Sequence, residues 1–416
     1  MAFCLSIYFL IIIIKKKDFY INDNYWIYLS FLLWFWFIFI SFFAYDVLLS
    51  FTDAIIFVRY VIFIIAIVYF FKNLKVKSLK LLLYIITCCT LFVTLDSLFQ
   101  FYNYENLDGF KGDIFGIQPN GLYGRLSGPF TDLVPGSYLS RFYFINFLLI
   151  ILFKNKLKNN IFILSSVIII LSLNFSVIYF SGERIAFATT IMGIFISIIF
   201  LKSIRKIIIF SIFFSIIFIF ANQIVHPHFN NYKVIKDTAH HEGLIIERNF
   251  KCKNNKAEIC TKQFFVQPSF LTILKNFNQS AYSELYMTSI QMWKDNKITG
   301  IGLNNFEKMC RSEHLYNQYH KIFGCGTHPH NYYIQALTES GIIGLVLFVF
   351  LIILLSYNCI NSKTNEMKII GIITILVLFW PIMSTGSFLK NWNMIFICYL
   401  IGIILGLKTK EFKFYN

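Results

Sequence analysis

Residues 327–345 read THPHNYYIQALTESGIIGL and join a long polar loop to an apolar segment of membrane-helix length. His330 and Asn331 are followed, after nine further residues, by Gly341 and Gly344. On a helix, Leu337, Gly341 and Gly344 return to nearly one face below His330. We expect the glycines to let a neighbouring helix approach closely while the imidazole stays at the water-facing end. A titratable group held in this way indicates chemistry at the membrane surface.

The composition indicates a membrane protein. Of the 416 residues, 57% are hydrophobic and only 14% are charged. Apolar runs of about 18 residues or more recur between short basic loops, a pattern that soluble domains do not show. We therefore predict an all-α polytopic membrane protein with eleven or twelve transmembrane helices. The expected spans lie near residues 1–14, 25–43, 54–71, 79–100, 136–153, 161–179, 183–201, 206–225, 332–356, 369–388 and 391–407.

The basic residues predict the orientation of these spans. Lysine and arginine clusters fall in alternate loops, which the positive-inside rule assigns to the cytoplasm. The net charge of +16 follows largely from this pattern and is poor evidence for nucleic-acid binding. Residues 1–225 are expected to hold about eight spans, residues 226–331 a large outward-facing loop, and residues 332–416 about three spans and a cytoplasmic tail. Residues 1–14 are short for a span, but they lack a signal-peptide cleavage site, so we interpret them as a first helix.

Cysteine positions agree with this layout. Four of the nine cysteines lie in the large outward loop, where an oxidising compartment favours disulfides. We predict the pairs Cys252–Cys260 and Cys310–Cys325, because each closes a short loop, although three pairings are formally possible. Zinc binding is the alternative, since all eight histidines also lie in this loop. The loop has no CxxC or HExxH spacing, so we expect no metal site.

The large loop has some predicted structure of its own. A helix is expected at about 280–296, and GIGLNNF at 300–306 is typical of a turn, with Gly300 and Gly302, that starts a short helix. The segment is too small for a separate catalytic domain with its own core. We interpret it as a lid over the outer mouth of the helical bundle.

Two arginines lie where outward loops enter the membrane. Arg125 belongs to the glycine-rich stretch GLYGRLSGPFTDLVPGSYLSR at 121–141, and Arg184 to SGERIAF at 181–187, where Ser181 is expected to cap the helix. The helix dipole disfavours an arginine in the first turn, so Arg184 needs another reason to be there. A guanidinium grips phosphate oxygens in a bidentate manner and stays charged when partly buried. Snorkelling, or an ion pair with Glu183, is the structural alternative.

His330 is the candidate general base. A lone histidine at a helix start is usually a hydrogen-bonded surface residue. However, helix N-termini favour bound anions, and the two outward arginines are topologically able to reach the same place. A histidine that titrates near neutral pH can take a proton from a sugar hydroxyl while arginines hold a phosphate leaving group.

Four motifs together resemble the O-antigen ligase family. They are HN-x9-GxxGL at 330–345, GIGLNNF at 300–306, SGERIAF at 181–187 and RLSGPFTD at 125–132. Two cysteines bracket the region before the histidine, as in one branch of that family. The resemblance covers residues 125–407 in order, and the first four spans match only in hydropathy. The family shares a superfamily with O-antigen polymerases and protein O-oligosaccharyltransferases.

The resemblance implies a GT-C-like glycosyltransferase that needs no metal, nucleotide or other cofactor. Its members transfer a glycan from undecaprenyl diphosphate to a sugar hydroxyl of lipid A–core on the periplasmic face of the bacterial inner membrane. Carried over residue by residue, His330 is the base, and Arg184 and Arg125 bind the donor diphosphate. Asn331 and His328 are neighbours that shape the site. Many relatives have an arginine in the helix before the glycine turn. This chain has none there, so Arg311 substitutes for it or the donor is gripped differently.

Other functions use the same features. A polymerase that extends the glycan on its lipid carrier would use the same residues, and protein O-glycosylation is a further relative. A transporter or flippase is the non-enzyme alternative. It would place broken helices and ionisable groups near the middle of the membrane, whereas the candidate charges here gather at one outer face.

Overall fold

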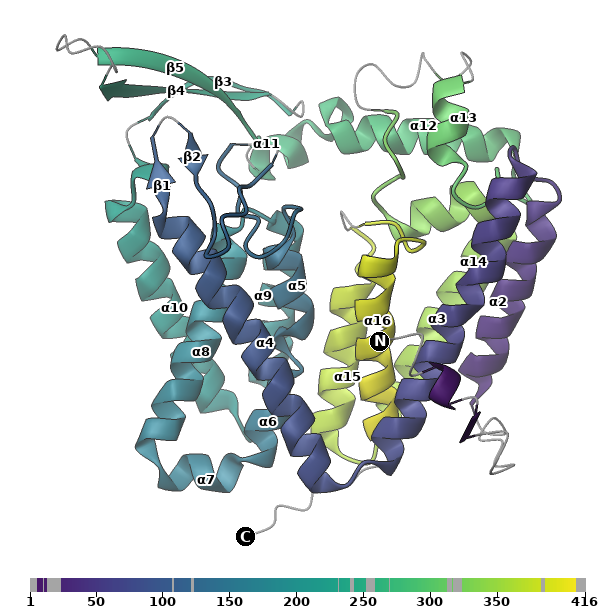
Figure 1. Cartoon of the computed structure of the whole chain (residues 1–416), viewed down its shortest axis with the longest axis horizontal. Coiled ribbons are helices and arrows are strands. Elements are labelled where there is room, and N and C mark those ends of the chain that lie inside the picture. Colours follow the sequence, from purple (N-terminus) through teal and green to yellow (C-terminus); the bar gives the residue numbers. More distant parts are fainter. Residues whose placement is uncertain are drawn as a thin grey trace. The chain divides into compact units, whose positions relative to one another are not determined.

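A computed structural model of the chain describes residues 6–9, 11–12, 24–106, 108–120, 123–230, 232–239, 243–251, 259–268, 270–312, 316, 324–382 and 386–408. The described chain is mostly helical and divides into two compact units (Figure 1). Unit 1 comprises residues 1–75 and 281–411, and unit 2 comprises residues 76–280 and 412–416. Unit 1 joins the beginning of the chain to its last third, and the three consecutive segments expected from the sequence stay a prediction.

Unit 1 is a helical bundle. Its helices are α2 (Tyr25–Ser41), α3 (Val47–Asn73), α12 (Ala281–Asp295), α13 (Phe306–Ser312), α14 (Tyr332–Ile360), α15 (Asn365–Leu378) and α16 (Asn391–Leu407). Helices α3 and α16 pack closely at two glycines. A Cβ atom on Gly402 would lie 2.3 Å from Ile67 Cγ2, and one on Gly406 would lie 2.6 Å from Phe71 Cβ. Small residues at such crossings allow the tight van der Waals packing that holds membrane helices together.

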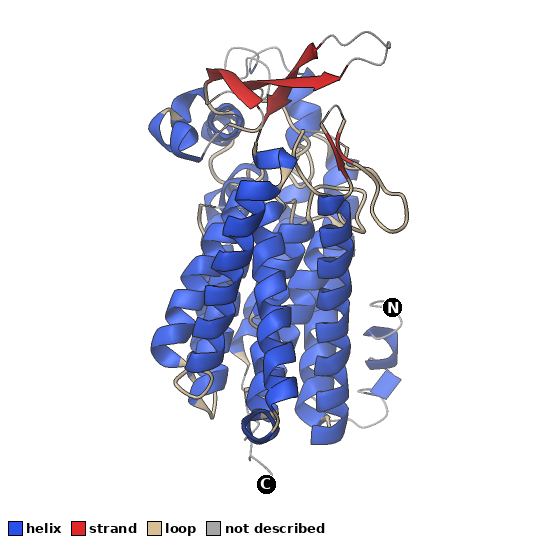
Figure 2. Cartoon of the chain, turned by 90° about the vertical axis from the view of Figure 1, so that its left-hand side faces the viewer, coloured by secondary structure: helices blue, strands red, loops and turns tan. Residues whose placement is uncertain are grey.

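Unit 2 combines helices with two small antiparallel sheets. Its helices are α4 (Val76–Tyr102), α5 (Pro135–Tyr143), α6 (Asn146–Leu152), α7 (Lys154–Asn159), α8 (Ile161–Phe180), α9 (Arg184–Phe200), α10 (Arg205–Val225) and α11 (Phe270–Lys275), with 3-10 turns η1 (Pro227–Phe229) and η2 (Phe277–Gln279). Strand β1 (Tyr104–Glu105) pairs with β2 (Gly109–Phe110). Strands β3 (Tyr232–Asp237), β4 (Leu244–Lys251) and β5 (Ile259–Val266) form the second sheet in that order. Within unit 2 the second sheet lies beyond one end of the helices, and α7 lies at the other end (Figures 1 and 2).

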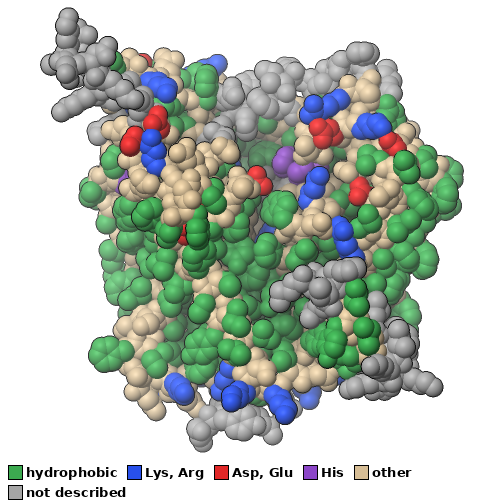
Figure 3. Space-filling view, viewed as in Figure 1, with side chains coloured by type: hydrophobic (Ala, Val, Ile, Leu, Met, Phe, Trp, Pro, Cys, Tyr) green, Lys and Arg blue, Asp and Glu red, His purple; other side chains and the backbone are tan. Residues whose placement is uncertain are grey.

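Among the residues that the structure describes, six helical segments are long and apolar enough to cross a membrane. They are α3, α4, the broken segment Pro135–Leu152, α8, α10 and α14, and each coincides with an expected span. The shorter apolar helices α2, α9 and α16 match three more. Hydrophobic side chains cover much of the helical surface, as a lipid-facing surface requires (Figure 3). The chain is therefore a multi-pass membrane protein. The count of eleven or twelve spans stays a prediction, and most of residues 1–14 lies outside the described residues.

The expected span at 369–388 is wrong in its second half. Helix α15 ends at Leu378, and residues 379–382 are not helical. Pro381 disfavours a helical conformation in the residue before it. The carbonyl oxygens of Phe379 and Pro381 instead accept hydrogen bonds from Tyr333 Oη and Asn331 Nδ2. Hydropathy alone could not reveal these contacts with α14.

The expectation of a purely helical fold is also wrong in detail. Strands β3 to β5 occupy residues in the loop that we expected to be merely polar. Arg248 of β4 attaches the sheet to the end of α10. Its side chain is 1% exposed, and it donates hydrogen bonds to the carbonyl oxygens of Pro227, His228 and Asn230. Tyrosine rings at 104, 123 and 232 lie within 6 Å of the guanidinium, at cation–π distances.

The loop at 226–331 is divided between the two units, at Ser280 and Ala281. The predicted helix at 280–296 is confirmed as α12, and the glycine turn at 300–306 does lead into α13. This part also has apolar packing that the sequence did not predict. Leu285, Met292, Ile301, Phe306, Cys310 and Tyr316 form a buried hydrophobic cluster. Five of these six side chains come from α12, the turn and α13, so these elements form one small packed body.

Candidate functional site

The start of α14 carries the first group of candidate residues. Asn331 is the N-cap of the helix, and its Oδ1 accepts hydrogen bonds from the backbone N–H groups of Tyr333 (2.9 Å) and Ile334 (3.2 Å). Its Nδ2 donates to the carbonyl oxygen of Pro381 at 2.8 Å. Asn331 thus satisfies two free donors of the helix end and ties that end to the chain between α15 and α16. In the structure, it is a structural neighbour of His330.

His330 precedes this cap in an unusual conformation. Its φ is +57°, in the left-handed region that few residues other than glycine adopt. The imidazole rings of His328 and His330 have centroids 4.1 Å apart, and the Tyr282 ring lies 6.5 Å from His330. His328 is buried and hydrogen-bonds Thr327 Oγ1 through Nδ1, whereas His330 is half-buried. The two histidines therefore form one cluster, with the more accessible ring on His330.

Three further side chains fix the first turns of α14. Tyr333 Oη donates to the Phe379 carbonyl oxygen at 2.6 Å. Asn393 Nδ2 donates to Tyr332 Oη at 2.6 Å, and Gln335 Nε2 donates to Ser387 Oγ at 2.7 Å. Gln335, Tyr332, Ser387 and Asn393 are all buried. A fully bonded buried polar network of this kind holds a helix in one position, so His330 stands on a rigid support.

The expected glycine face on a continuous helix is wrong. Gly341 has φ +69° and ψ −174°, so α14 is kinked there. The carbonyl groups of Thr338 and Glu339 accept hydrogen bonds from the backbone nitrogens of Ile301 and Gly302, each at 3.0 Å. The freed Ser340 carbonyl oxygen accepts from Trp36 Nε1 at 2.9 Å. Gly300 and Gly341 thus allow a loop, rather than a helix, to pack against α14. The hydrogen bonds from this loop and from Trp36 satisfy carbonyl groups of α14, and unpaired backbone groups inside a membrane protein need such partners.

Gly344 does meet a neighbouring helix, as expected. A Cβ atom on Gly344 would lie 3.2 Å from Trp36 Nε1 of α2. Gly302 also makes a close contact, because a Cβ atom there would lie 2.2 Å from Ala44 Cβ, and its φ is +90°. These glycines serve close approach within unit 1.

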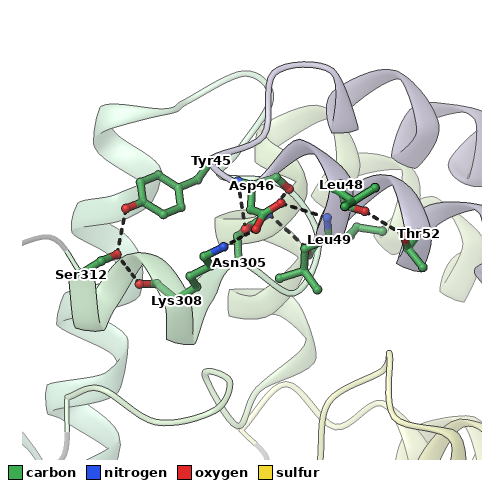
Figure 4. A network of polar contacts seen from close by, with 9 residues as sticks. Tyr45, Asp46, Leu48, Leu49, Thr52, Asn305, Lys308 and Ser312 are labelled. Carbon is green, nitrogen blue, oxygen red and sulfur yellow. Dashed lines mark hydrogen bonds and ion pairs between the residues drawn. The ribbon is translucent and has the colours of Figure 1, made fainter.

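A polar network holds α13 against the turn between α2 and α3 (Figure 4). Lys308 pairs with Asp46, whose pKa is lowered chiefly by the hydrogen bond from Lys308 and then by that from Leu49. Asn305 Oδ1 accepts from the Asp46 backbone nitrogen at 3.1 Å, and Tyr45 Oη bonds Ser312 Oγ at 2.8 Å. The turn at 300–306, which packs against α14, is therefore also held in place by the turn between α2 and α3.

The predicted disulfide between Cys310 and Cys325 is confirmed, with a Cα–Cα distance of 5.8 Å. It links α13 to the segment that leads directly into His328 and His330. Cys252 lies outside the described residues, so its pairing with Cys260 stays a prediction. Among the described residues no group of three or more histidine, cysteine, aspartate or glutamate side chains could hold a metal ion.

Arg311 lies in the last turn of α13. Its Nη2 pairs with Glu307 Oε1 at 2.8 Å, and its side chain is 66% exposed. An exposed pair at this spacing contributes little to stability, roughly 0.3–0.5 kcal/mol. The ion pair accounts for the position of Arg311, and its binding of a substrate stays a prediction.

Unit 2 carries the two candidate arginines. Arg125 is half-buried, and its Nη2 donates to the Leu133 carbonyl oxygen at 2.9 Å. Its Nε is buried and has no hydrogen-bond partner among the described residues. A buried N–H without a partner costs about 1–3 kcal/mol, so this nitrogen is a donor ready for an added acceptor. A phosphate oxygen is such an acceptor.

The turn at 181–184 lies beside Arg125. A Cβ atom on Gly182 would lie 3.5 Å from Arg125 Cγ. Glu183 Oε1 accepts from the Gly136 backbone nitrogen at 2.7 Å, and its Oε2 accepts from Ser137 Oγ. Burial raises the pKa of Glu183, while the charge of Arg125 and the bonds from Ser137 and Gly136 oppose that rise. A carboxylate at this position completes the first turn of α5.

Arg184 is the first residue of α9, as expected, but Ser181 does not cap that helix. The residue before α9 is Glu183, which makes no side-chain capping bond to it. Ser181 instead ends α8, where its Oγ donates to the Ile178 carbonyl oxygen at 2.8 Å. The reason is that Gly182, with φ +74°, turns the chain between the two helices. The Glu183 carboxylate is engaged with the start of α5 rather than with its own helix.

The sequence predicts that the candidate histidines and arginines meet at one site, but they belong to different units. His330, His328, Asn331 and Arg311 belong to unit 1, whereas Arg125 and Arg184 belong to unit 2. Each unit brings its own residues together, as the histidine cluster and the Arg125–Glu183 cluster show. The convergence of the two clusters on one substrate stays a prediction.

Sequence reasoning missed several buried ionisable residues. Glu339 is 1% exposed in α14 and accepts a hydrogen bond from Gln335 Nε2 at 3.1 Å. Asp96 in α4 is 0% exposed, and Arg141 in α5 is 8% exposed. A charged residue inside an apolar span is costly and marks a functional or structural site. Glu339 and Arg141 are each the single charge within an expected span, and Asp96 shares its span only with Lys80 near the opposite end, so the sequence did carry a signal for them.

Residues 167–349 match the family model described as O-antigen ligase. The matched segment contains SGERIAF, GIGLNNF and the first part of α14 with His330 and Asn331, whereas Arg125 precedes it. No curated protein matches the chain significantly. The resemblance drawn from the motifs is thereby confirmed over residues 167–349, which are similar to the O-antigen ligase family.

Proposed function

We propose that this protein transfers a glycan from undecaprenyl diphosphate to a sugar hydroxyl of lipid A–core. The family match supports a function of O-antigen ligase or polymerase type on lipid-linked glycans in a membrane. The observation that carries the finer proposal is the His330 imidazole, half-buried on a rigid helix start inside the matched segment. A general base must be accessible to its substrate and held in place, and His330 meets both conditions.

In the proposed reaction, His330 accepts the proton of the acceptor hydroxyl. The hydroxyl oxygen attacks the anomeric carbon of the donor glycan, and the bond between that carbon and the phosphate oxygen breaks. The electron pair leaves with undecaprenyl diphosphate. Because the donor is already an activated diphosphate ester, the step consumes no ATP, and we expect it to need neither a metal nor another cofactor.

Arg125 and Arg184 would bind the donor diphosphate. The unpartnered Nε of Arg125 offers a buried donor, and Glu183 is already engaged by Gly136 and Ser137. A guanidinium placed at the leaving group neutralises the negative charge that develops there. Such electrostatic stabilisation usually lowers the barrier more than any other single effect. Asn331 and His328 would shape the acceptor side of the site.

The positions of the basic residues along α8 and α9 support a periplasmic location for Arg125 and Arg184. Glu183 and Arg184 lie between the end of α8 and the first turn of α9, and Arg125 lies beside Gly182 of the same turn. Lys154, Lys156, Lys158 and Lys202 lie at the opposite ends of these two helices. Basic residues favour the cytoplasmic side, so the arginine cluster would face the periplasm of a bacterial inner membrane. Reporter fusions at 154–159 and at 232–266 test this, and a cytoplasmic position for the second would contradict it.

Two variants of one residue test the base. His330→Gln keeps a polar side chain of similar size but cannot accept the proton, and His330→Ala removes the ring. Both should lower transfer by about 100- to 10,000-fold, the range for a lost general base. The readout is surface glycan attached to core sugar on a gel, with protein abundance measured in the same membranes. A normal amount of glycan attached to core sugar in either variant would show that His330 is not the general base.

The same gel separates the closest alternative. In a deletion strain, loss of all chain lengths from the core together with carrier-bound polymer indicates a ligase. Core capped with a single repeat unit indicates a polymerase instead. Unchanged lipopolysaccharide with altered glycoproteins indicates protein O-glycosylation.

A further inference from the structure

Helix α4 carries a buried polar face near its outer end. Asp96, Ser97 and Gln100 are all 0% exposed, although the helix is apolar and long enough to cross a membrane. Polar groups in such a place are retained where they bind something. Here they face two loops of unit 2, the segment at 113–117 and the segment at 126–128.

Gln100 bonds both loops at once. Its Oε1 accepts hydrogen bonds from the backbone nitrogens of Ser127 (2.8 Å) and Gly128 (2.9 Å). Its Nε2 donates to Ser127 Oγ (3.0 Å) and to the Ile117 carbonyl oxygen (3.1 Å). Acceptor and donor halves of the amide are thus both used, and neither half can rotate without losing two bonds.

The segment held by Gln100 comes directly after Arg125. Leu126 and Ser127 are 0% exposed, and Gly128 packs against α4. A Cβ atom on Gly128 would lie 2.4 Å from Ser97 Oγ, and the φ of Gly128 is +53°. Arg125 is the last residue before this buried anchor and is itself only half-buried. The buried residues 126–128 therefore fix the position of the Arg125 backbone, from which the guanidinium side chain extends.

Asp96 fixes the other loop one turn earlier on α4. Its Oδ1 accepts from the Ile114 backbone nitrogen at 3.1 Å. Asp113 closes the loop on itself, since its Oδ1 accepts from the backbone nitrogens of Phe115 and Ile117. The Ile117 carbonyl oxygen that Gln100 binds also accepts a hydrogen bond from the Asp113 backbone nitrogen at 3.0 Å, so it is held from two sides.

We infer that Gln100 is a positioning residue, which holds residues 126–128 against α4 and thereby aims the Arg125 guanidinium at the donor diphosphate. The inference rests on the proposed function, in which Arg125 binds that diphosphate. Gln100 touches no substrate and acts only through Arg125. The chemistry that it serves is the recognition of a lipid-linked diphosphate by the loop.

The first test compares Gln100→Leu with Thr90→Val in the full-length protein in proteoliposomes. Thr90 is a buried residue of the same helix that bonds within α4 and to Asn146, so its variant controls for general weakening of α4. The donor is an undecaprenyl-diphosphate-linked glycan. We expect Gln100→Leu to raise the KM for the donor on the order of tenfold, because a displacement of about 1 Å can cost up to about 100-fold. The acceptor KM should not change, and Thr90→Val should leave the donor KM unchanged.

A second pair of variants moves the anchor without touching Gln100 or Arg125. Gly128→Ala places a methyl group against Ser97 Oγ and should raise the donor KM in the same way. Ser97→Ala removes that oxygen, which has no hydrogen-bond partner among the described residues, and should be neutral alone. The donor KM of the double variant should lie between the raised donor KM of Gly128→Ala and that of the unaltered protein. This arm keeps the inference testable if Gln100→Leu fails to fold.

A double-mutant cycle separates the two ways to fail. If Gln100 acts through Arg125, Gln100→Leu adds nothing to the donor KM of Arg125→Ala. Additive effects of the two changes, or an unchanged donor KM in folded Gln100→Leu and Gly128→Ala, would overturn the positioning role while Arg125→Ala still impairs donor binding. An unchanged donor KM in Arg125→Ala would overturn the proposed role of Arg125, and the inference with it.

Discussion

Gly341 packs so closely on the backbone of Ile298 that a Cβ atom on Gly341 would lie 1.9 Å from the Ile298 carbonyl oxygen. The Ile342 backbone nitrogen donates to the neighbouring Lys297 carbonyl oxygen at 3.0 Å. The kink in α14 and the loop before Gly300 therefore form one backbone-to-backbone joint. The joint lies on α14, the helix that His330 precedes, so the loop is part of the support of that helix.

Gly341→Ala should destabilise unit 1 strongly. Its backbone conformation (φ +69°, ψ −174°) is adopted almost only by glycine and costs about 1–3 kcal/mol for an alanine, and the backbone clash adds to that cost. Gly116→Ala is the matched control, because Gly116 has φ +82° but a Cβ atom there would meet nothing within 4 Å. Thermal unfolding in detergent should therefore show a much larger loss for Gly341→Ala. Equal losses would mean that the contact with Ile298 contributes nothing.

Removal of the Cys310–Cys325 disulfide should lower the stability of the packed body around α13. The bond closes a loop with a sequence separation of 15, which is worth about 3 kcal/mol in the chain-entropy description. Cys310→Ser with Cys325→Ser should lower the melting temperature and reduce transfer, because the linked segment leads into His330. Cys88→Ser, at an exposed free cysteine, is the control. An unchanged melting temperature in the double variant would contradict the prediction.

Unit 2 should lose stability in mild acid through His228. Burial lowers the pKa of His228 to about 3, and the charges of Arg248 and His226 act in the same direction. Between that pKa and the ordinary value of about 6.5, only the unfolded chain binds the proton. The contribution of neutral His228 to the free energy of unfolding of unit 2 is thus fully present above pH 6.5. It falls by about 1.4 kcal/mol for each pH unit below that value.

Thermal unfolding at pH 7.5 and pH 5.5 checks this dependence. His228→Phe keeps a ring against Phe110 and Phe229 but cannot titrate. Its melting temperature should fall less between the two pH values than that of the unaltered protein. Some dependence should remain, because burial also lowers the pKa of His226. An equal fall in both proteins would rule out His228 as the source.

Arg184→Lys tests the proposed diphosphate contact. A lysine keeps the charge but cannot form two parallel hydrogen bonds to one phosphate. Loss of a charge-assisted hydrogen bond, about 1.5–3 kcal/mol, corresponds to roughly a 10- to 100-fold fall in kcat/KM for the donor. Arg205→Lys is the control, since Arg205 begins the next helix and its Nη2 donates to the Ile199 carbonyl oxygen. Full activity of Arg184→Lys would exclude bidentate binding by this residue.

Much of the fold follows from patterns that are local in the sequence. The spans expected at 79–100 and 161–179 appear as α4 and α8, because about 20 apolar residues in a row form a helix in a membrane. The Cys310–Cys325 pair was predictable because it closes a short loop. The span at 369–388 failed because the hydrogen bonds that Asn331 and Tyr333 make to Pro381 and Phe379 are not visible in hydropathy.

The sequence predicted the residue types of the candidate site, and these stay a prediction, but it did not predict their local arrangement. The sequence pointed to His330, Arg125 and Arg184 because titratable groups at membrane boundaries are costly. It pointed to the wrong cap for α9, since Ser181 could serve either helix beside Gly182. Nothing in it indicated that Gln100 bonds Ser127 and Gly128, which lie 27 and 28 positions further along the chain.

The sequence by itself determined that the chain is a multi-pass membrane protein, that its lysine clusters lie in the loops between spans, and that residues 167–349 resemble the O-antigen ligase family. Hydropathy and short motifs encode these properties within a few turns of chain. Only the tertiary structure decided that Gly341 breaks α14, that a loop rather than a helix docks there, and that Glu183 serves α5. The reason is that a buried backbone or side-chain polar group takes whichever partner the fold brings within about 3 Å, and that partner can lie anywhere in the sequence.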